Sequence, residues 1–357
     1  MAGGRLLVDE THLGRHVTGL ERITLELFSA QALAPLQVEP VRSSGLPAMI
    51  AQQTVGLPLK LLLDRRSIAL CPGFPPSVPL SRFGDRVVPY VHDSFLLTRP
   101  QDLNWRARVY MAPAFAAALK RLPWLLVNSA TTRADIQRFA RPDAEITLYR
   151  PVIRDVFGIA GLAGMRRAPA ADAVLRLVAI GTVEPRKNLD LLLDAWAALR
   201  DESADTPPLL VAGPDGWSSG ATHRRMERLA SAGLRRLGHL DRTDLIAVLQ
   251  AATIFVFPSL YEGFGLPAAE AMACGVPVLV SATSSLPEVV GDAGGQFDPE
   301  DPAELAVLLR EWLEAPELLS AARERGLERA AAFTWRRSAE LHADSFRRAL
   351  AAGSATR

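Results

Sequence analysis

The chain has 357 residues, of which 49% are hydrophobic and 22% charged, and its formal net charge is +1. This composition excludes a disordered chain and a dedicated nucleic-acid binder, and the length suits two domains better than one. The two cysteines, Cys71 and Cys274, are too few for a disulfide scaffold, so we expect a reducing, cytoplasmic setting.

The charge is distributed unevenly. Residues 1–165 hold 19 Lys and Arg against 13 Asp and Glu, so the N-terminal half is basic and the remainder acidic. A basic half fits peripheral contact with the anionic inner face of a membrane, a phosphorylated acceptor, or an ordinary solvated surface. The first residues show no secretory signal. The longest apolar run, near 245–260, is broken by Gln250 and is too short to span a bilayer.

Short runs of Val, Ile and Leu alternate along the chain with segments of helical spacing, which predicts parallel sheets with crossover helices. In the first half the expected strands are RLLVDE, RSIALCPG, RVVPYVHD and WLLVNS, with helices over 18–33 and 104–121. In the second half they are VLRLVAIG, PLLVAG, TIFVFPS and VPVLVS, with helices beginning near Asn188, Thr222, Thr243 and Pro267. These last strands have the continuous apolar pattern of strands buried on both faces.

The stretch 158–173 is rich in Gly, Ala and Pro, and it predicts a linker. We therefore expect domains over 1–165 and 166–335, with a final helix over 336–357 that packs back toward the first domain. The predicted fold class is α/β, with two doubly wound Rossmann-like domains facing a central cleft and a helical C-terminal segment after Pro299. Ligands of open parallel sheets bind at the carboxyl ends of the strands.

The stretch LYEGFGLP follows the strand that ends at Ser259, and Pro267 stands where the first helical turn begins. A helix N-terminus entered through glycines is a site for an anion such as phosphate. Glu262 in the loop and Glu270 one turn into the helix would then suit neutral diols on either side of the anion. In the alternative interpretation, Glu262 is a first-turn charge and Glu270 a surface residue.

Three weaker signals lie at other strand ends. Arg186 and Lys187, in GTVEPRKNLDLL, place two cations before a helix, which fits a diphosphate and also an ordinary solvated helix start. His92, in YVHDSF, ends an apolar strand, where a histidine is either structural or chemical. Gly19, in TGLERITLEL, precedes a helix and would let a ligand approach the backbone closely.

Taken together, GTVEPRKNL, SLYEGFGLPAAEAMACGVPVLVS and SSLPEVVGDAG resemble glycosyltransferase family four, the retaining enzymes of the GT-B fold. In the first half the resemblance rests on TGLERIT, VHD and VNSATTRADI. It implies a nucleotide-diphosphate sugar as donor, bound by the second domain, and a glycan or lipid-linked acceptor on the side of the first, with no cofactor and no nucleic acid. The EPRKN version of the motif is similar to that of mannosyltransferases of polysaccharide assembly, which favours GDP-mannose.

The resemblance also implies roles for individual residues. Glu270 would hold the ribose hydroxyls and Glu262 those of the transferred sugar. His92 would lie by the reacting centre, and Gly19 would give the phosphates or acceptor room. The diphosphate would be held by Arg186, Lys187 and the loop backbone at Gly263, Phe264, Gly265 and Leu266. Many members carry arginine where this chain has Thr182, so Arg186 would carry more of the charge here.

No D-x-D occurs in the sequence, so the usual carboxylate pair for a metal bridge to a diphosphate is missing, and we expect no metal. Other classes of function remain to be weighed. A nucleotide-sugar epimerase or a phosphorylase would share the fold. A serine hydrolase would use Ser218 in GWSSG, although Pro214 and Asp215 separate that motif from its strand. A dinucleotide oxidoreductase would need a G-x-G-x-x-G that the strand ends lack.

Overall fold

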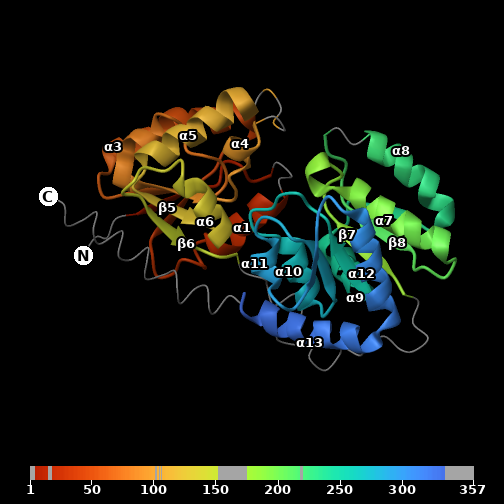
Figure 1. Cartoon of the computed structure of the whole chain (residues 1–357). Coiled ribbons are helices and arrows are strands. Elements are labelled where there is room, and N and C mark those ends of the chain that lie inside the picture. Colours follow the sequence, from red (N-terminus) through yellow and green to blue (C-terminus); the bar gives the residue numbers. More distant parts are fainter. Residues whose placement is uncertain are drawn as a thin grey trace. The chain divides into compact units, whose positions relative to one another are not determined.

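The computed structural model describes residues 5–14, 18–100, 103, 105, 107–151, 175–217 and 220–333. The chain divides into two compact units (Figure 1): unit 1 is Met1–Val152 with Trp335–Arg357, and unit 2 is Ile153–Thr334. The linker expected at 158–173 and the final helix expected at 336–357 lie outside the described residues.

Unit 1 is built on a six-stranded parallel sheet in the order β2-β1-β3-β4-β5-β6. Its strands are β1 (Leu6–Asp9), β2 (Val38–Val41), β3 (Ile68–Cys71), β4 (Val87–Val91), β5 (Trp124–Val127) and β6 (Glu145–Leu148). The four strands expected in this half are confirmed. The sequence patterns did not indicate β2 or β6.

Helices cover both faces of this sheet. The helical segments are α1 (Thr18–Leu27), α2 (Gly45–Ala51), η1 (Gln52–Gly56), α3 (Leu57–Leu63), η2 (Leu80–Arg86), α4 (Phe95–Thr98), η4 (Ala107–Met111), α5 (Ala112–Arg121) and α6 (Ala130–Gln137). Buried side chains of α3, α5 and α6 share one hydrophobic core with alternate residues of the strands. On the other face, Phe28 at the end of α1 packs against Tyr90 and Tyr149.

The expected helix over 18–33 is shorter than predicted, because α1 ends at Leu27. The continuous helical stretch Gly45–Leu63 was not expected. It has a mean hydropathy of 1.2 and, among the described residues, it alone has the length and apolar character of a membrane span. The apolar run near 245–260, by contrast, forms the end of one helix and a core strand of unit 2.

Unit 2 is built on a second six-stranded parallel sheet, in the order β12-β11-β10-β7-β8-β9. Its strands are β7 (Leu177–Ile180), β8 (Leu209–Ala212), β9 (Arg235–Gly238), β10 (Ile254–Phe257), β11 (Val278–Ser281) and β12 (Gly295–Phe297). Its helical segments are η6 (Pro185–Lys187), α7 (Leu189–Glu202), α8 (Gly220–Leu229), η7 (Ala230–Ala232), α9 (Arg242–Gln250), α10 (Leu266–Ala273), α11 (Leu286–Val290), α12 (Pro302–Glu314) and α13 (Pro316–Ala331).

The two faces of this sheet carry separate hydrophobic cores. One core holds α10, α11 and Ala330 of α13, and the other holds α7 and α12. Every residue of β10 and β11 is buried, as the continuous apolar runs predicted. The four helix starts expected in this half are confirmed to within two residues.

The order of the strands determines where each sheet accommodates a ligand. In unit 2 the chain runs outward from β7 through β8 to β9 and then returns to place β10 on the other side of β7. In unit 1 the same reversal occurs between β1 and β3. Ligands of doubly wound sheets bind at the carboxyl ends of strands where the order reverses. The carboxyl ends of β7 and β10 are therefore the first place to look in unit 2.

Candidate functional site

The turn after β7 holds Arg186 and Lys187 in a fixed position. Residues Pro185–Lys187 form a single 3₁₀ turn, which ends at Asn188 in a left-handed conformation with φ of 52°. The Asn188 side chain donates a hydrogen bond of 2.8 Å to the Pro299 carbonyl. The Lys187 side chain passes across the strand end, where its Cδ would lie 3.4 Å from a Cβ on Gly181. An alanine at this position would therefore contact the lysine at an ordinary van der Waals distance.

The loop after β10 leads into α10 through Gly265. This glycine has φ of 93°, and a Cβ there would lie 2.6 Å from Cδ2 of Leu286. Pro267 occupies the first turn of α10, where its missing N–H breaks no helical hydrogen bond. Pro267 has no N–H, and the Ala268 N–H donates to the Gly265 carbonyl at 3.1 Å. The N–H of Leu266, at the first position of the helix, has no partner within the helix and lies at the positive end of the helix dipole. The chain thus places the N-terminus of α10 shortly after the end of β10.

Glu262 brings the two loops together. Its Oε1 accepts a hydrogen bond of 2.5 Å from Nζ of Lys187, and its Oε2 lies 3.4 Å from Nη1 of Arg186. The Lys187 and Glu262 side chains are only 12% and 10% exposed, so this is a buried ion pair. Arg186 also binds Glu184 at 2.9 Å and donates to the Tyr261 carbonyl at 3.1 Å. Residues 75 positions apart in the sequence thus meet at the reversal point between β7 and β10.

Two serines that the sequence patterns did not single out hold the Glu262 backbone. The Ser284 hydroxyl accepts a hydrogen bond of 2.9 Å from the Glu262 N–H, and the Ser285 hydroxyl donates one of 2.9 Å to the Glu262 carbonyl. Ser284 has a positive φ of 51°, which is uncommon for a residue other than glycine. Both serines begin the SSLPEVVGDAG stretch, so the signal that would have identified them was their place in a quoted motif.

The two members of the pair shift each other's pKa. Burial acts to raise the pKa of Glu262, but Lys187 and Arg186 outweigh it, and the pKa lies below its ordinary value. Burial lowers the pKa of Lys187, and the Glu262 carboxylate opposes that shift. The site therefore holds the cations Arg186 and Lys187 and the carboxylates Glu184 and Glu262, together with the positive end of α10. Cations of this kind suit phosphate oxygens, and the Glu262 carboxylate suits hydroxyl groups.

Glu270 lies within α10 and is 3% exposed, so the interpretation of this residue as a surface charge is wrong. Glu262 is 8% exposed, which likewise contradicts a first-turn charge pointing into solvent. Phe264 is also buried, and its ring packs edge to face on that of Phe333, with 5.4 Å between the ring centroids. That contact fixes the loop that carries the backbone N–H groups of Gly263, Phe264, Gly265 and Leu266.

The remaining expected residues belong to unit 1. His92 follows β4 and is partly buried, and its Nε2 lies 2.6 Å from the Pro72 carbonyl. Because a carbonyl oxygen only accepts, Nε2 carries the proton and Nδ1 is the acceptor of the neutral ring. Burial lowers the pKa of His92 to about 4. Gly19 lies within the first turn of α1 rather than before the helix, and no heavy atom lies within 4 Å of a Cβ placed on it.

A histidine that was not anticipated lies at the same edge of unit 1. His12 follows β1 and is 1% exposed, and its Nε2 lies 2.8 Å from the Thr24 hydroxyl. A Cβ on Gly73, which follows β3, would lie 2.3 Å from Nδ1 of His12. Glycine is therefore required where the backbone passes this ring. His12 has no distinctive sequence pattern, and only the reversal between β1 and β3 places it at a ligand-binding edge.

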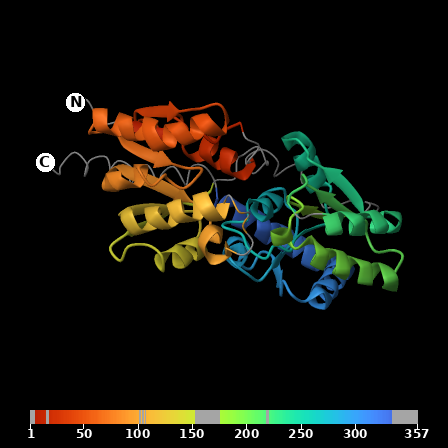
Figure 2. The ribbon, with the colours of Figure 1, turned by 90° about the horizontal axis from the view of Figure 1, so that it is seen from above.

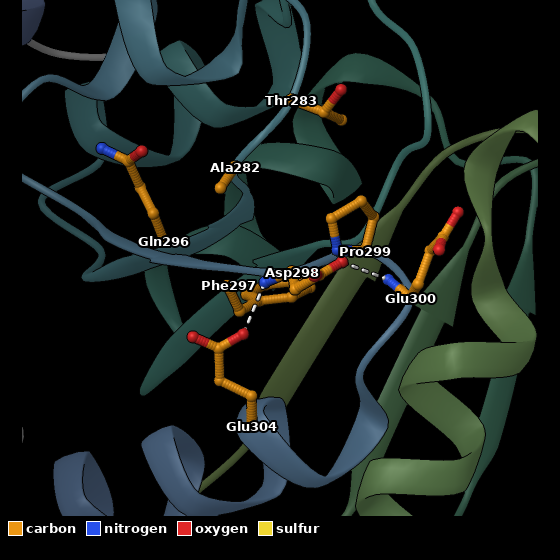
Figure 3. A pocket seen from close by; sticks show the side chains of 8 residues that line it. All are labelled: Ala282, Thr283, Gln296, Phe297, Asp298, Pro299, Glu300 and Glu304. Carbon is orange, nitrogen blue, oxygen red and sulfur yellow. Dashed lines mark hydrogen bonds between the residues drawn. The ribbon is translucent and has the colours of Figure 1, made fainter.

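An open pocket of about 520 Å³ lies beside the site in unit 2 (Figure 3). Its wall includes the carboxylates of Asp298, Glu300 and Glu304. The Asp298 carboxylate accepts a hydrogen bond from the Glu300 N–H, and the Glu304 carboxylate accepts one from the Asp298 N–H. Three carboxylates repel a diphosphate, so the pocket is not the anion site. It adjoins that site through Thr283, which precedes Ser284, and through Pro299, which accepts the bond from Asn188.

Two further expectations concern a serine nucleophile and a bound metal. Ser218 of the G-x-S-x-G motif lies outside the described residues. Within the part of the chain that the structure describes, no three His, Cys, Asp or Glu side chains are grouped to hold a metal ion.

Residues 167–329 match the family described as glycosyl transferases group 1. The chain carries a domain of that family. The matched range contains Arg186, Lys187, Glu262 and Glu270, so every site residue expected in unit 2 lies within the group 1 domain. The family resemblance seen in the motifs is thereby confirmed.

Two curated proteins illustrate the relationship of the group 1 domain to its relatives. O-antigen chain mannosyltransferase B of Escherichia coli is 44% identical over 157 residues, which cover 44% of this chain and 41% of that protein. D-inositol 3-phosphate glycosyltransferase of Geodermatophilus obscurus is 36% identical over 279 residues, which cover 71% of this chain and 60% of that protein. The chain thus spans less than two thirds of the length of either relative.

Among solved structures, sucrose-phosphate synthase from Thermosynechococcus elongatus superimposes with a TM-score of 0.74 at 19% identity, covering 98% of this chain and 100% of that chain. At this level of identity the likeness concerns the fold alone. Together with the two six-stranded parallel sheets, it confirms the expected GT-B class of fold for this protein.

Proposed function

We propose that the protein transfers a hexose, with mannose the favoured sugar, from a nucleotide-diphosphate sugar to a glycan or lipid-linked acceptor. The supporting observation is the buried cluster of Lys187, Arg186 and Glu262 beside the N-terminus of α10. The resemblance of the EPRKN motif and the similarity to a mannosyltransferase support GDP-mannose as the donor. Two buried cysteines that form no disulfide fit a cytoplasmic protein, and a lipid-linked acceptor implies peripheral contact with a membrane.

In this proposal the cations of the group 1 domain stabilise the departing diphosphate. Lys187, Arg186 and the first-turn N–H groups of α10 bind the phosphate oxygens, where negative charge develops as the glycosidic bond breaks. Glu262 accepts hydrogen bonds from hydroxyls of the transferred sugar, and Glu270 accepts them from the ribose. His92 contributes a neutral ring near the reacting centre, and Gly19 gives the phosphates or acceptor room.

The proposed reaction retains the configuration at the sugar carbon and uses no metal. The acceptor oxygen forms a bond to the anomeric carbon on the face that the leaving phosphate departs from. The bond from that carbon to the phosphate oxygen breaks, and the acceptor proton passes to the same phosphate. No enzyme carboxylate is required as a nucleophile, in contrast to retaining hydrolases.

A panel of nucleotide sugars tests the donor. A ligand that binds only the folded state raises the unfolding temperature by mass action. We expect GDP-mannose to raise it more than UDP-glucose or GDP alone, and to be hydrolysed slowly to GDP and mannose of unchanged configuration. If none of the nucleotide sugars raised the unfolding temperature, the proposal would be contradicted. Epimerised nucleotide sugar, or a sugar phosphate formed when phosphate is added, would indicate an epimerase or a phosphorylase instead.

A further inference from the structure

Exposed apolar side chains gather on one side of unit 1. Fourteen large hydrophobic residues are exposed in the described part of the chain, and nine of them belong to two segments of this unit. Six lie on the continuous helical stretch α2–η1–α3, namely Leu46, Ile50, Val55, Leu59, Leu62 and Leu63. Three lie in or just before η4, namely Trp105, Val109 and Tyr110. This clustering exceeds the single exposed residues that are normal on a protein surface.

The helical geometry aligns the six side chains on one face of the α2–η1–α3 stretch. Leu46 and Ile50 are four residues apart, as are Val55 and Leu59, which is one α-helical turn. The interval from Ile50 to Val55 is five residues, and it includes the π-helical turn η1, in which i→i+5 hydrogen bonds place residues five apart above one another. The extra residue of the π turn thus keeps both halves of the apolar face aligned.

The opposite side of the same stretch packs against the core of unit 1. Leu57 and Leu61 are fully buried, and Gln53 donates a hydrogen bond of 2.8 Å to the Asp9 carboxylate at the end of β1. If the stretch left the sheet to cross a bilayer, this core would be exposed and Asp9 would lose its hydrogen bond from Gln53. The stretch therefore suits a position in the plane of an interface rather than a transmembrane one.

The second segment lies on the same face of the sheet. Phe115 and Leu119 on the inner side of α5 share a hydrophobic core with Leu57 and Leu61 of α3. Seen from above, α3, η2 and α5 lie side by side (Figure 2). The centroids of the Trp105 and Tyr110 rings lie 6.4 Å apart, and both side chains are exposed. Tyr and Trp are the residues typical of the boundary between lipid tails and headgroups.

The charges around this face are mainly positive. Residues 45–63 and 103–134 contain six Lys and Arg and no Asp or Glu, with Asp64, Asp102 and Asp135 just outside them. The segment η2, between α3 and α5, adds Arg82 and Arg86 against the exposed Asp85. Arg65 and Arg66 follow α3 and are exposed. The acidic neighbours Glu39 and Asp64 each have cationic partners, in Lys60 and Arg5. An apolar strip bordered by cations is complementary to anionic lipid.

We propose that the exposed face of α2–η1–α3, with Trp105, Val109 and Tyr110, lies on an anionic lipid membrane. A second copy of the chain fits this face less well, because two such surfaces would bring their arginines and lysines together. The inference rests on the proposed function in that a lipid-linked acceptor is found at such a surface. Binding of the nucleotide sugar involves other residues, in unit 2, and does not depend on it.

Co-sedimentation with vesicles tests the proposal, using equal parts of phosphatidylcholine and phosphatidylglycerol. The full chain should sediment with these vesicles at low salt, and less with phosphatidylcholine alone. The triple variant Leu59→Gln, Leu62→Gln, Leu63→Gln should bind about tenfold more weakly or worse, because it removes the apolar contacts but none of the core. The matched control Val307→Gln, Leu318→Gln changes similarly exposed side chains in unit 2 and should bind like the wild type.

Absence of vesicle binding by the wild type, or equal binding by the triple variant, would overturn the proposal. So would a wild-type dimer that the triple variant converts to a monomer, since the face would then be a contact between copies. The thermal shift with GDP-mannose is measured on the same samples. An unchanged shift in the triple variant shows that it is folded, whereas a failed donor shift with intact vesicle binding would count against the proposed function alone.

Discussion

Lys187 and Glu262 have both a structural and a proposed chemical role. As a buried ion pair they stabilise each other. Removal of Glu262 leaves the Lys187 charge buried without its hydrogen-bonded partner, whereas removal of Lys187 leaves Glu262 with Arg186 as its remaining cation. In the proposed reaction each has its own ligand, phosphate for Lys187 and sugar hydroxyls for Glu262. A double-mutant cycle separates the two roles, since stability depends on the pair and catalysis on each member.

Lys187→Met and Glu262→Gln should each lower the unfolding free energy. For Lys187→Met the loss should be about 3 kcal/mol, at the lower end for breaking a buried ion pair, because Arg186 remains near the Glu262 carboxylate. The double variant should regain most of that stability. Sugar transfer should fall by about a hundredfold or more in all three proteins, since the double variant restores no ligand contact. Denaturant unfolding and transfer rates provide the two readouts. Near wild-type transfer by either single variant would refute the assignment.

His92 provides a prediction of pH dependence. Its pKa is about 4 in the folded protein, below the ordinary value of 6.5, so between these values the unfolded chain binds the proton more tightly. Stability should therefore fall as the pH drops through this window and level off below it. The loss attributable to His92 should be about 3 kcal/mol.

The matched comparison for His92 is His92→Gln, which keeps a donor for the Pro72 carbonyl but does not titrate. Unfolding free energies measured from pH 7 to pH 4 should decline less in this variant than in the wild type. Parallel curves for the two proteins would show that His92 does not titrate with a lowered pKa.

At the scale of elements, the strands that sequence patterns missed are the edges of the two sheets. β2 and β6 flank the first sheet, and β9 and β12 flank the second. These edge strands are partly exposed to solvent, so they lack the continuous apolar run that identified the central strands. β2 contains Pro40, which an edge strand tolerates, and β9 begins with Arg235 and Arg236.

The α2–η1–α3 stretch was missed for a different reason. Gly45, Pro47, Gly56 and Pro58 punctuate it, and these residues usually mark turns. Pro47, however, lies in the first turn of α2, where proline is tolerated, and Pro58 lies inside the continuous helix, directly after the π turn. The π turn between the helices has no sequence signature, so this exposed face was found only in the structure.

Gly265 determines how the chain enters α10. Gly265→Ala should cost about 1 to 2 kcal/mol for its left-handed conformation, with a further loss from the overlap with Leu286. It should also weaken GDP binding, because the first-turn N–H groups of α10 shift. Gly238→Ala is the control, since this residue has φ of 69° but no heavy atom within 4 Å of its Cβ. Equal stability losses and equal GDP affinities in the two variants would contradict this explanation.

For the whole molecule, the alternation of strands and helices predicted two doubly wound units, and the structure confirms them. The motifs also predicted that Arg186, Lys187 and Glu262 lie at strand ends. The ion pair was not predictable, because it requires β10 to return beside β7, and a local pattern does not specify the strand order. The serines that hold Glu262 depend on the same long-range arrangement.

Metal independence is a prediction for the whole enzyme. The positive charge that offsets the leaving diphosphate comes in this proposal from Arg186, Lys187 and the N-terminus of α10. Transfer should therefore continue at an undiminished rate after exhaustive treatment with EDTA. Complete loss of activity that Mn²⁺ restores would show that a cation shares this task.

Calorimetric titration of GDP-mannose tests the central claim most directly, namely that the Lys187 and Glu262 cluster holds the donor diphosphate. The chain has three lysines, and Lys120 is exposed at the end of α5, so Lys120→Met is the matched control for Lys187→Met. Lys120→Met should bind the donor like the wild type, whereas Lys187→Met should bind it about tenfold more weakly or worse. Equal affinity in the two variants would contradict the claim.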